Sequence, residues 1–462
     1  MNDKITGYLW RICLVASLGG ILFGFDTAVI SGTFGMVEEQ FALSKIQVGW
    51  FGSSALVGAI VGAFFAGGLS DRWGRKPILM LSALLFFLSA LFCAIPMDFF
   101  YLIVARLIGG LGVGMASVLS PMYISEMAPA RFRGRLVALY QLSIVVGILL
   151  AYFSNWILLE KSQNAEAMID FVWYEMIFKS EVWRGMFAAE MLPSGLFFLL
   201  LFSVPESPRW LIDRGFKEKG LSILRKIAPS SSIQKLEEKD EEEISGKGVR
   251  TLLQPGWRQA LAVGVGLSVF GQFTGVNIVI YYGPQILEGA GFELDGAIQF
   301  QVLIGVINLI FTIIALTRID SWGRRPLLIG GMISVFLTLC GIGFSFGSGS
   351  SGLVTVVFLC LYVASLAISI NAVIWVLIGE IYPTHIRGQA MSIATFANWG
   401  TNFGAAFLFP WYVSIVGLGA GFFTFAGFCL IAIFFFYRYV PETKGMTLEQ
   451  IEKFWINKEI SK

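Results

Sequence analysis

Long apolar stretches recur along almost the whole chain and are separated by short polar segments. Each is about 20 residues long, the length that an α-helix needs to cross about 30 Å of hydrocarbon. Lipid offers no partner to backbone N–H and C=O groups, so each stretch is expected to be a transmembrane helix. The twelve predicted spans lie near residues 9–36, 47–69, 78–96, 99–123, 135–158, 184–205, 259–288, 298–318, 327–346, 354–380, 389–412 and 418–440.

The composition agrees with a membrane protein and narrows its chemistry. Of the 462 residues, 56% are hydrophobic and 14% are charged, against roughly a quarter charged in soluble domains, which excludes a water-soluble globular enzyme. Lys and Arg total 33 against 31 Asp and Glu, and the net charge of +2 leaves no global basic field to hold nucleic acid. The five Cys and one His show no metal-ligand spacing, so we expect no metal site, disulfide framework or cofactor.

Cations gather on one side of the predicted membrane layer. Clusters follow the second, fourth and eighth spans, whereas the loops after spans three, seven, nine and eleven contain neither Lys nor Arg. Short cation-rich loops stay on the cytoplasmic side, and both termini share that bias. We therefore expect a multi-pass protein of the cytoplasmic (inner) membrane, with the lipid bilayer as partner and both termini in the cytoplasm. We also expect it to be monomeric.

A single sizeable polar insert, residues 206–258, divides the chain into two halves of six predicted spans each. The expected fold is therefore an all-α membrane protein with twelve transmembrane helices in two six-helix halves. The expected parts are the N-terminal half (1–205), a cytoplasmic helical linker (206–258), the C-terminal half (259–440) and a cytoplasmic tail (441–462).

The two halves repeat each other at the ends of corresponding spans. Long-period self-similarity of this kind is typical of transporter folds, and it predicts two halves of one topology related by an axis along the membrane normal. The paired segments are Asp71–Pro77 with Asp320–Pro326, Glu126–Gly134 with Glu380–Gly388, and Val204–Ser207 with Val440–Thr443.

Longer motifs accompany the repeat at Gly67–Lys76, Arg106–Gly110, Pro205–Leu211, Gln272–Tyr282 and Pro441–Gly445. They match the patterns GxxxDRxGRR, RxGG, PESPRWL, QxxGxNxxxYY and PETKG, and by them the whole chain resembles the sugar porter family of the major facilitator superfamily. It is most similar there to bacterial proton-coupled xylose symporters. The resemblance implies the major facilitator fold and proton-coupled uptake of xylose or another pentose or hexose. A facilitative uniporter for a sugar or polyol is the alternative.

Two opposite charges lie inside predicted spans. Asp26 is in the first span and Arg106 opens the fourth, where an ionised side chain at the helix centre costs on the order of 2.5 to 3.5 kcal/mol. Their signs invite pairing, and protonation of Asp26 would leave Arg106 without its partner, which is a minimal proton-coupling device. The resemblance assigns them this role, which argues against the uniporter. The other reading is a fixed ion pair that orders two helices. Glu190 is a further carboxylate within a span, for which a structural role is favoured.

Amides and aromatic residues within spans suit a sugar, which needs hydrogen bonds to its hydroxyls and flat apolar walls for its C–H faces. The alternative is that the amides join helices to one another. Many of these residues match sugar-contact positions of the family, which leads us to expect a substrate site. The candidates are Phe23, Gln141, Gln272, Asn277, Tyr281, Asn371, Trp375, Asn398 and Trp399.

Carboxylates and guanidinium groups lie together at the cytoplasmic ends of the helices. Arg and carboxylate form planar bidentate pairs, so such a set can hold helix ends together and release them as the halves rock. The other reading is that these charges only set topology. The resemblance supports a gate, and its candidates are Asp71, Arg75, Glu126, Arg133, Glu206, Asp320, Arg324, Glu380, Arg387 and Glu442.

Two positions depart from the family pattern. Gly271 stands where the family has a first glutamine, and Asn371-Ala372 replaces Gly-Pro. The loss of one amide and the gain of another change the expected hydroxyl contacts, so the sequence does not identify the sugar. The missing proline is expected to stiffen the tenth span. A membrane enzyme is not expected, because we find no cluster of nucleophile, base or metal-binding carboxylates.

Overall fold

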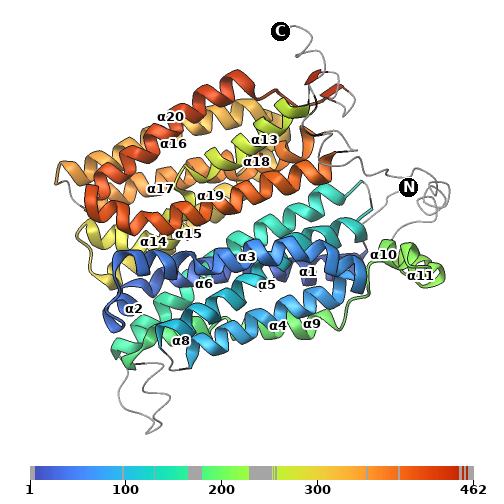
Figure 1. The fold of residues 1–462 in the computed structure, drawn as a ribbon, viewed down its shortest axis with the longest axis horizontal. Coiled ribbons are helices and arrows are strands. Elements are labelled where there is room, and N and C mark those ends of the chain that lie inside the picture. Colours follow the sequence, from blue (N-terminus) through green and yellow to red (C-terminus); the bar gives the residue numbers. More distant parts are fainter. Residues whose placement is uncertain are drawn as a thin grey trace. The chain divides into compact units, whose positions relative to one another are not determined.

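The computed structural model describes residues 6–95, 98–129, 131–164, 179–227, 252, 254, 257–349, 352–382, 386–446, 450–451 and 454–455. Every regular element within these residues is a helix (Figure 1). The chain forms two compact units, Met1–Leu43 with Trp50–Glu242, and Ser44–Gly49 with Glu243–Lys462. The all-helical class predicted from the sequence is confirmed.

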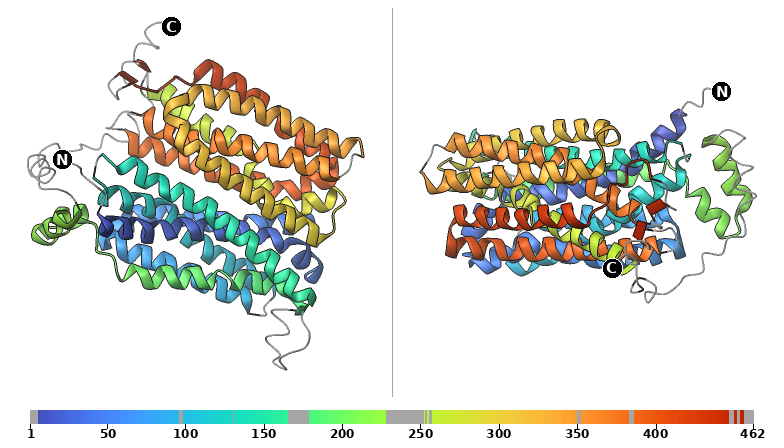
Figure 2. Two further views of the ribbon diagram at one scale, coloured as in Figure 1. Left: turned by 180° about the vertical axis from the view of Figure 1, so that it is seen from behind. Right: turned by 90° about the horizontal axis from the view of Figure 1, so that it is seen from above.

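The helices of the first unit follow the order expected for the N-terminal half. They are α1 (Gly7–Val29), η1 (Ile30–Gly32), α2 (Phe34–Gln40), most of α3 (Lys45–Trp73), α4 (Arg75–Ala94), α5 (Phe99–Met127), α6 (Arg133–Asn164), α8 (Val182–Ala188), α9 (Met191–Leu201), α10 (Pro208–Asp213) and α11 (Lys217–Ile227). The short α10 and α11 lie beyond one end of the long helices of this unit (Figure 2).

The second unit contains the helices expected for the C-terminal half. They are α13 (Trp257–Gln272), α14 (Val276–Gly289), α15 (Leu294–Trp322), α16 (Arg324–Gly347), α17 (Gly352–Ile368), α18 (Ile370–Glu380), α19 (Arg387–Val416) and α20 (Leu418–Tyr439).

The internal repeat is visible in how the helices pack within each unit. In the first unit α1 packs against α6, and α4 packs against both α5 and α9. In the second unit α13 packs against α19, and α16 packs against both α17 and α20. These are the same neighbours at corresponding places, so each half builds one bundle of the same design.

Eleven of the twelve expected spans are helices long and apolar enough to cross a membrane. The remaining expected span, 389–412, lies within the 30-residue helix α19. This helix contains Asn398 and Asn402 as well as Gln389, and such amides lower its mean hydropathy. At 30 residues α19 is long enough to cross a membrane, but its polar side chains keep it below the hydropathy of the other eleven helices.

Three spans expected to be continuous are interrupted. The sixth breaks between α8 and α9 at Glu190, and the seventh between α13 and α14 just before Gly275, whose φ of +82° is left-handed. The tenth breaks between α17 and α18 at Ser369, with φ −118° and ψ −90°. The tenth span therefore bends without a proline. Its Ser369 hydroxyl donates to the Ser365 carbonyl at 2.5 Å, and Gly331 leaves room for that side chain.

Candidate functional site

A buried ion pair joins α1 to α5. Arg106 Nη1 lies 2.7 Å from Asp26 Oδ1, and each side chain is 2% exposed. The sequence predicted both residues as partners, and the structure brings them together. Loss of either partner would leave an uncompensated buried charge, which is strongly unfavourable.

Small residues allow the close helix packing that this pair requires. Gly109 faces Ser89 and lies near the Asp26 carboxylate, so that a Cβ there would be 3.3 Å from Asp26 Oδ1. Gly24 and Gly147 pack directly on the backbones of α6 and α1. Glycine permits such backbone contact between membrane helices. At Gly109 the missing side chain leaves room on α5 for the Asp26 carboxylate of α1.

Glu190 adds a second carboxylate to this buried site. It lies at the break between α8 and α9, is 1% exposed, and acts electrostatically on both Asp26 and Arg106. Within the part of the chain that the structure describes, its Oε1 and the Nε of Arg106 have no hydrogen-bond partner. In the described structure only Asp26 of the two carboxylates is bonded to the guanidinium, so with Glu190 protonated the ionised Asp26–Arg106 pair leaves the group with no net charge. Neutrality is favoured in a low-dielectric site.

Three amides in the second unit form a continuous hydrogen-bonded chain. Asn277 Nδ2 donates to Gln272 Oε1 at 2.7 Å, and Gln272 Nε2 donates to Asn398 Oδ1 at 2.8 Å. The break before Gly275 places Gln272 and Asn277 on the same side despite their separation along the chain. All three side chains are half-buried. Amide N–H and C=O groups that the chain does not use are therefore accessible to a polar ligand.

Other candidates for sugar contact lie in both units. In the second unit, Tyr281 is 3% and Trp399 is 7% exposed, while Trp375 is 40% exposed and Asn371 is half-buried one turn before it. In the first unit, Phe23 on α1 and Gln141 on α6 are half-buried.

Sequence reasoning missed Asn402. Its Nδ2 donates to the Tyr281 hydroxyl at 3.2 Å in a buried position. Asn402 lies four residues after Asn398 on α19, and this helical spacing was the signal that could have indicated it.

The departure at Gly271 has a steric explanation. A Cβ at this buried position would lie 2.5 Å from Cδ1 of Ile374 on α18. Ile374 is itself buried and occupies the space that a side chain at 271 needs. An apolar isoleucine therefore stands beside the amide chain.

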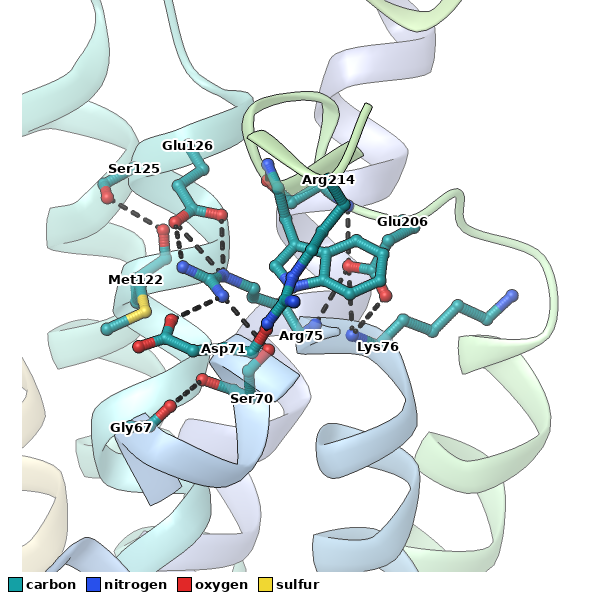
Figure 3. A network of polar contacts seen from close by, with 12 residues as sticks. Gly67, Ser70, Asp71, Arg75, Lys76, Met122, Ser125, Glu126, Glu206 and Arg214 are labelled. Carbon is teal, nitrogen blue, oxygen red and sulfur yellow. Dashed lines mark hydrogen bonds and ion pairs between the residues drawn. The ribbon is translucent and has the colours of Figure 1, made fainter. Parts of the chain in front are cut away.

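The charged motif at the turn between α3 and α4 of the first unit is a compact polar network (Figure 3). The Arg75 guanidinium lies between two carboxylates: its Nη2 is 3.0 Å from Glu126 Oε1 and its Nη1 is 2.9 Å from Asp71 Oδ1. Its Nε also donates to Glu126 Oε2 at 3.1 Å. The fork geometry of Arg accounts for this choice over Lys. Trp210 of α10 and Arg214 just after that helix donate to the Asp71 carbonyl, which fastens α10 to α3.

Glu206 caps the start of α4. Its carboxylate accepts hydrogen bonds from the backbone N–H groups of Arg75 at 3.0 Å, Lys76 at 3.2 Å and Ser207 at 2.7 Å, and a negative charge is favoured at a helix N-terminus. Burial raises the pKa of Glu206 above its usual range, although these backbone hydrogen bonds oppose the rise. Gly74, with φ +103°, carries the turn that lets Glu206 approach.

The second unit repeats this arrangement. Arg324 Nη2 lies 3.2 Å from Glu380 Oε1, and Glu442 accepts from the backbone N–H groups of Arg324 and Arg325, both at 3.1 Å. Gly323 has φ +88° and corresponds to Gly74. Asp320 lies in α15, but its side chain is outside the described residues.

Two predicted gate residues contact carbonyls. Arg133 Nε donates to the Ser125 carbonyl at 3.0 Å, and Arg387 Nε donates to the Tyr382 carbonyl at 3.2 Å. Such bonds satisfy the last carbonyls of α5 and the turn that follows α18.

Gly74→Ala is expected to destabilise the protein by about 1–3 kcal/mol, because a non-glycine residue is strained at positive φ. The new Cβ would also lie 2.3 Å from Glu206 Oε2. The measurement is the melting temperature of the purified protein, with Gly67→Ala as the control. Gly67 has open space where a Cβ would be added. An equal fall in melting temperature in both variants would contradict a special need for glycine at position 74.

The same architecture is found in known proteins. The family model for sugar (and other) transporters matches residues 12–455. The chain belongs to the sugar transporter family. This sugar transporter is 39% identical to the arabinose-proton symporter of Bacillus subtilis, with 97% of this chain and 96% of the relative covered. It is 37% identical to the D-xylose-proton symporter of Escherichia coli, with 98% and 97% covered.

A solved structure matches the fold of this sugar transporter. The inward-open xylose transporter XylE from E. coli superposes with a TM-score of 0.83 at 36% identity, covering 97% of this chain and all of that one. The resemblance stated from the motifs is thus confirmed at the level of sequence and of fold.

Proposed function

We propose that this protein is a symporter that couples proton entry to the uptake of a monosaccharide, xylose or another pentose or hexose. The observation that carries the proposal is the Asp26–Arg106 pair, buried together with Glu190 in one unit. A facilitator has no need of a titratable carboxylate at this depth, and burying one is costly. The names of the two symporters described above agree with proton coupling.

The coupling step follows from the geometry of the pair. A proton from outside neutralises Asp26, and Arg106 then loses the charge on its 2.7 Å partner. The relative stability of two conformations changes with that contact. One proton moving through about 100 mV supplies about 2.3 kcal/mol, and one pH unit adds about 1.4 kcal/mol. Together they support roughly several-hundredfold accumulation.

Sugar recognition is assigned to the amide chain Gln272–Asn277–Asn398 and the aromatic residues near it in sequence. The amides hold one another in fixed orientations, so their remaining donors and acceptors are preorganised for hydroxyl groups. The exposed ring of Trp375 offers a flat surface to the C–H face of a sugar.

The cytoplasmic networks are proposed to hold helix ends in one conformation and to release them in another. Each is built on an Arg–Glu pair and a carboxylate helix cap. With the cation bias of the loops, they support an inner-membrane protein whose termini and linker face the cytoplasm. The proposed halves and linker keep the boundaries given by the sequence.

The test is uptake into proteoliposomes loaded with buffer. Labelled xylose, arabinose and glucose are supplied with and without an imposed inward proton gradient. We expect at least one sugar to accumulate above its external concentration only when the gradient is present. Equilibration that ignores the gradient would favour the uniporter, and no flux of any of the three would point to another substrate such as a polyol.

A further inference from the structure

The guanidinium of Arg106 has a second neighbour that the coupling step does not use. Its Cζ lies over the ring of Phe187, 5.3 Å from the ring centroid. Arg106 is 2% exposed and Phe187 is 1% exposed. A cation within about 6 Å of an aromatic face is attracted to it, and the attraction is largest where water is excluded.

The position of this ring is fixed by its surroundings. Phe187 lies in the last turn of α8, just before the break at Glu190, whose N–H donates to the Phe187 carbonyl at 3.1 Å. Other aromatic residues contact it edge-on: Phe51 at 6.4 Å and 79°, and Trp183 at 6.4 Å and 85°. Edge-to-face packing of this kind restrains a ring, so Phe187 cannot easily turn its face away from Arg106.

Three titratable side chains from different parts of the fold interact electrostatically with Arg106. Asp26 lies on α1, Glu190 at the α8–α9 break and Cys93 on α4. Among the described residues only Asp26 is hydrogen-bonded to the guanidinium, and Arg106 Nε has no hydrogen-bond partner there. When Asp26 is neutral, the ring of Phe187 is the rigid contact that still stabilises the cation.

We propose that Phe187 is a positioning residue for proton coupling. Its ring holds the Arg106 cation while Asp26 takes up a proton, and it thereby sets the external pH at which Asp26 is loaded. Without the ring, Arg106 depends more strongly on ionised Asp26, and protonation becomes harder. This inference rests on the proposed symport.

The experiment measures initial sugar uptake against external pH in proteoliposomes, with wild type, Phe187→Leu, Phe187→Tyr and Phe51→Leu. We expect Phe187→Leu to need about a tenfold higher external proton concentration for half-maximal uptake. This is a shift of the pH profile by about one unit to the acid side. Phe187→Tyr keeps the aromatic face and should retain the wild-type profile. Phe51→Leu removes one of the two rings that restrain Phe187 but leaves the ring over Arg106 in place, so it should shift the profile much less than Phe187→Leu.

A variant of nearly unchanged shape guards against misfolding. Fluorinated phenylalanines at position 187 withdraw charge from the ring face while keeping the ring, so the acid shift should grow with each added fluorine. An unchanged profile across that series, or equal shifts in Phe187→Leu and Phe51→Leu, overturns the role of Phe187 and leaves symport standing. Wild-type uptake that ignores pH overturns the proposed function and this inference with it.

A second readout does not depend on transport. In Asp26→Asn the cation has lost its ionic partner, so Phe187→Leu should lower the melting temperature more in that background than in wild type. Phe51→Leu should lower the melting temperature by the same amount in the wild-type and Asp26→Asn backgrounds. Equal losses for Phe187→Leu in the two backgrounds would show that the ring does not compensate for Asp26.

Discussion

Asp26→Asn is expected to abolish gradient-driven accumulation of sugar while sugar exchange survives. Asparagine keeps the shape of the side chain and can still accept a hydrogen bond from Arg106, but it cannot take up or release a proton. Accumulation of roughly several hundredfold should therefore fall to simple equilibration. The measurement compares net uptake under an imposed proton gradient with counterflow of labelled sugar in the same vesicles.

Asp98→Asn is the matched control for this variant. Asp98 caps the start of α5, the helix of Arg106, by accepting from the Tyr101 N–H at 3.1 Å, and Asn caps a helix about as well as Asp. It should accumulate sugar like the wild type. Accumulation that persists in Asp26→Asn would reduce the Asp26–Arg106 pair to a structural contact between helices, and so would loss of exchange together with accumulation.

Gln272→Ala is expected to raise the half-saturating sugar concentration by about tenfold to a hundredfold. The change removes the central amide, to which both Asn277 and Asn398 are bonded, and each lost hydrogen bond with its unpaired partner costs on the order of 1 kcal/mol. Counterflow measured over a range of sugar concentrations gives this value directly.

Gln301→Ala separates sugar binding from helix joining. Gln301 is also a buried amide of the second unit, and its Nε2 donates to the Val279 carbonyl at 3.1 Å. Its loss should lower the melting temperature and leave the half-saturating concentration unchanged. If Gln272→Ala behaves in the same way, the amide chain joins helices and does not bind the substrate.

The span ends and the partners of charged residues could be predicted from the sequence. Isolated charges in apolar segments must pair, which leads from Asp26 to Arg106. The repeated motifs likewise indicated that Arg75 and Arg324 lie at equivalent places, and both contact the glutamate of the second motif in their own half.

The helix breaks could not be predicted, because hydropathy averages over about 20 residues and tertiary contacts decide where a helix yields. At the seventh span, the Tyr362 hydroxyl satisfies the Thr274 carbonyl at 2.7 Å. At the tenth, a side chain 38 positions earlier is absent at Gly331 and leaves space for Ser369. Both of these helix breaks depend on residues that are distant in sequence, so no local sequence pattern predicts them.

The buried charges and the linked amides lie in different units and share no residue. On the roles proposed, the proton-coupling pair and the amide chain can therefore change by mutation independently of each other. A descendant that lost Asp26 could become a passive carrier for the same sugar, whereas one that changed residue 271, 374 or 398 could acquire a new nutrient and keep its proton drive. A transporter built from two such bundles can thus diverge in substrate specificity while its proton coupling is retained.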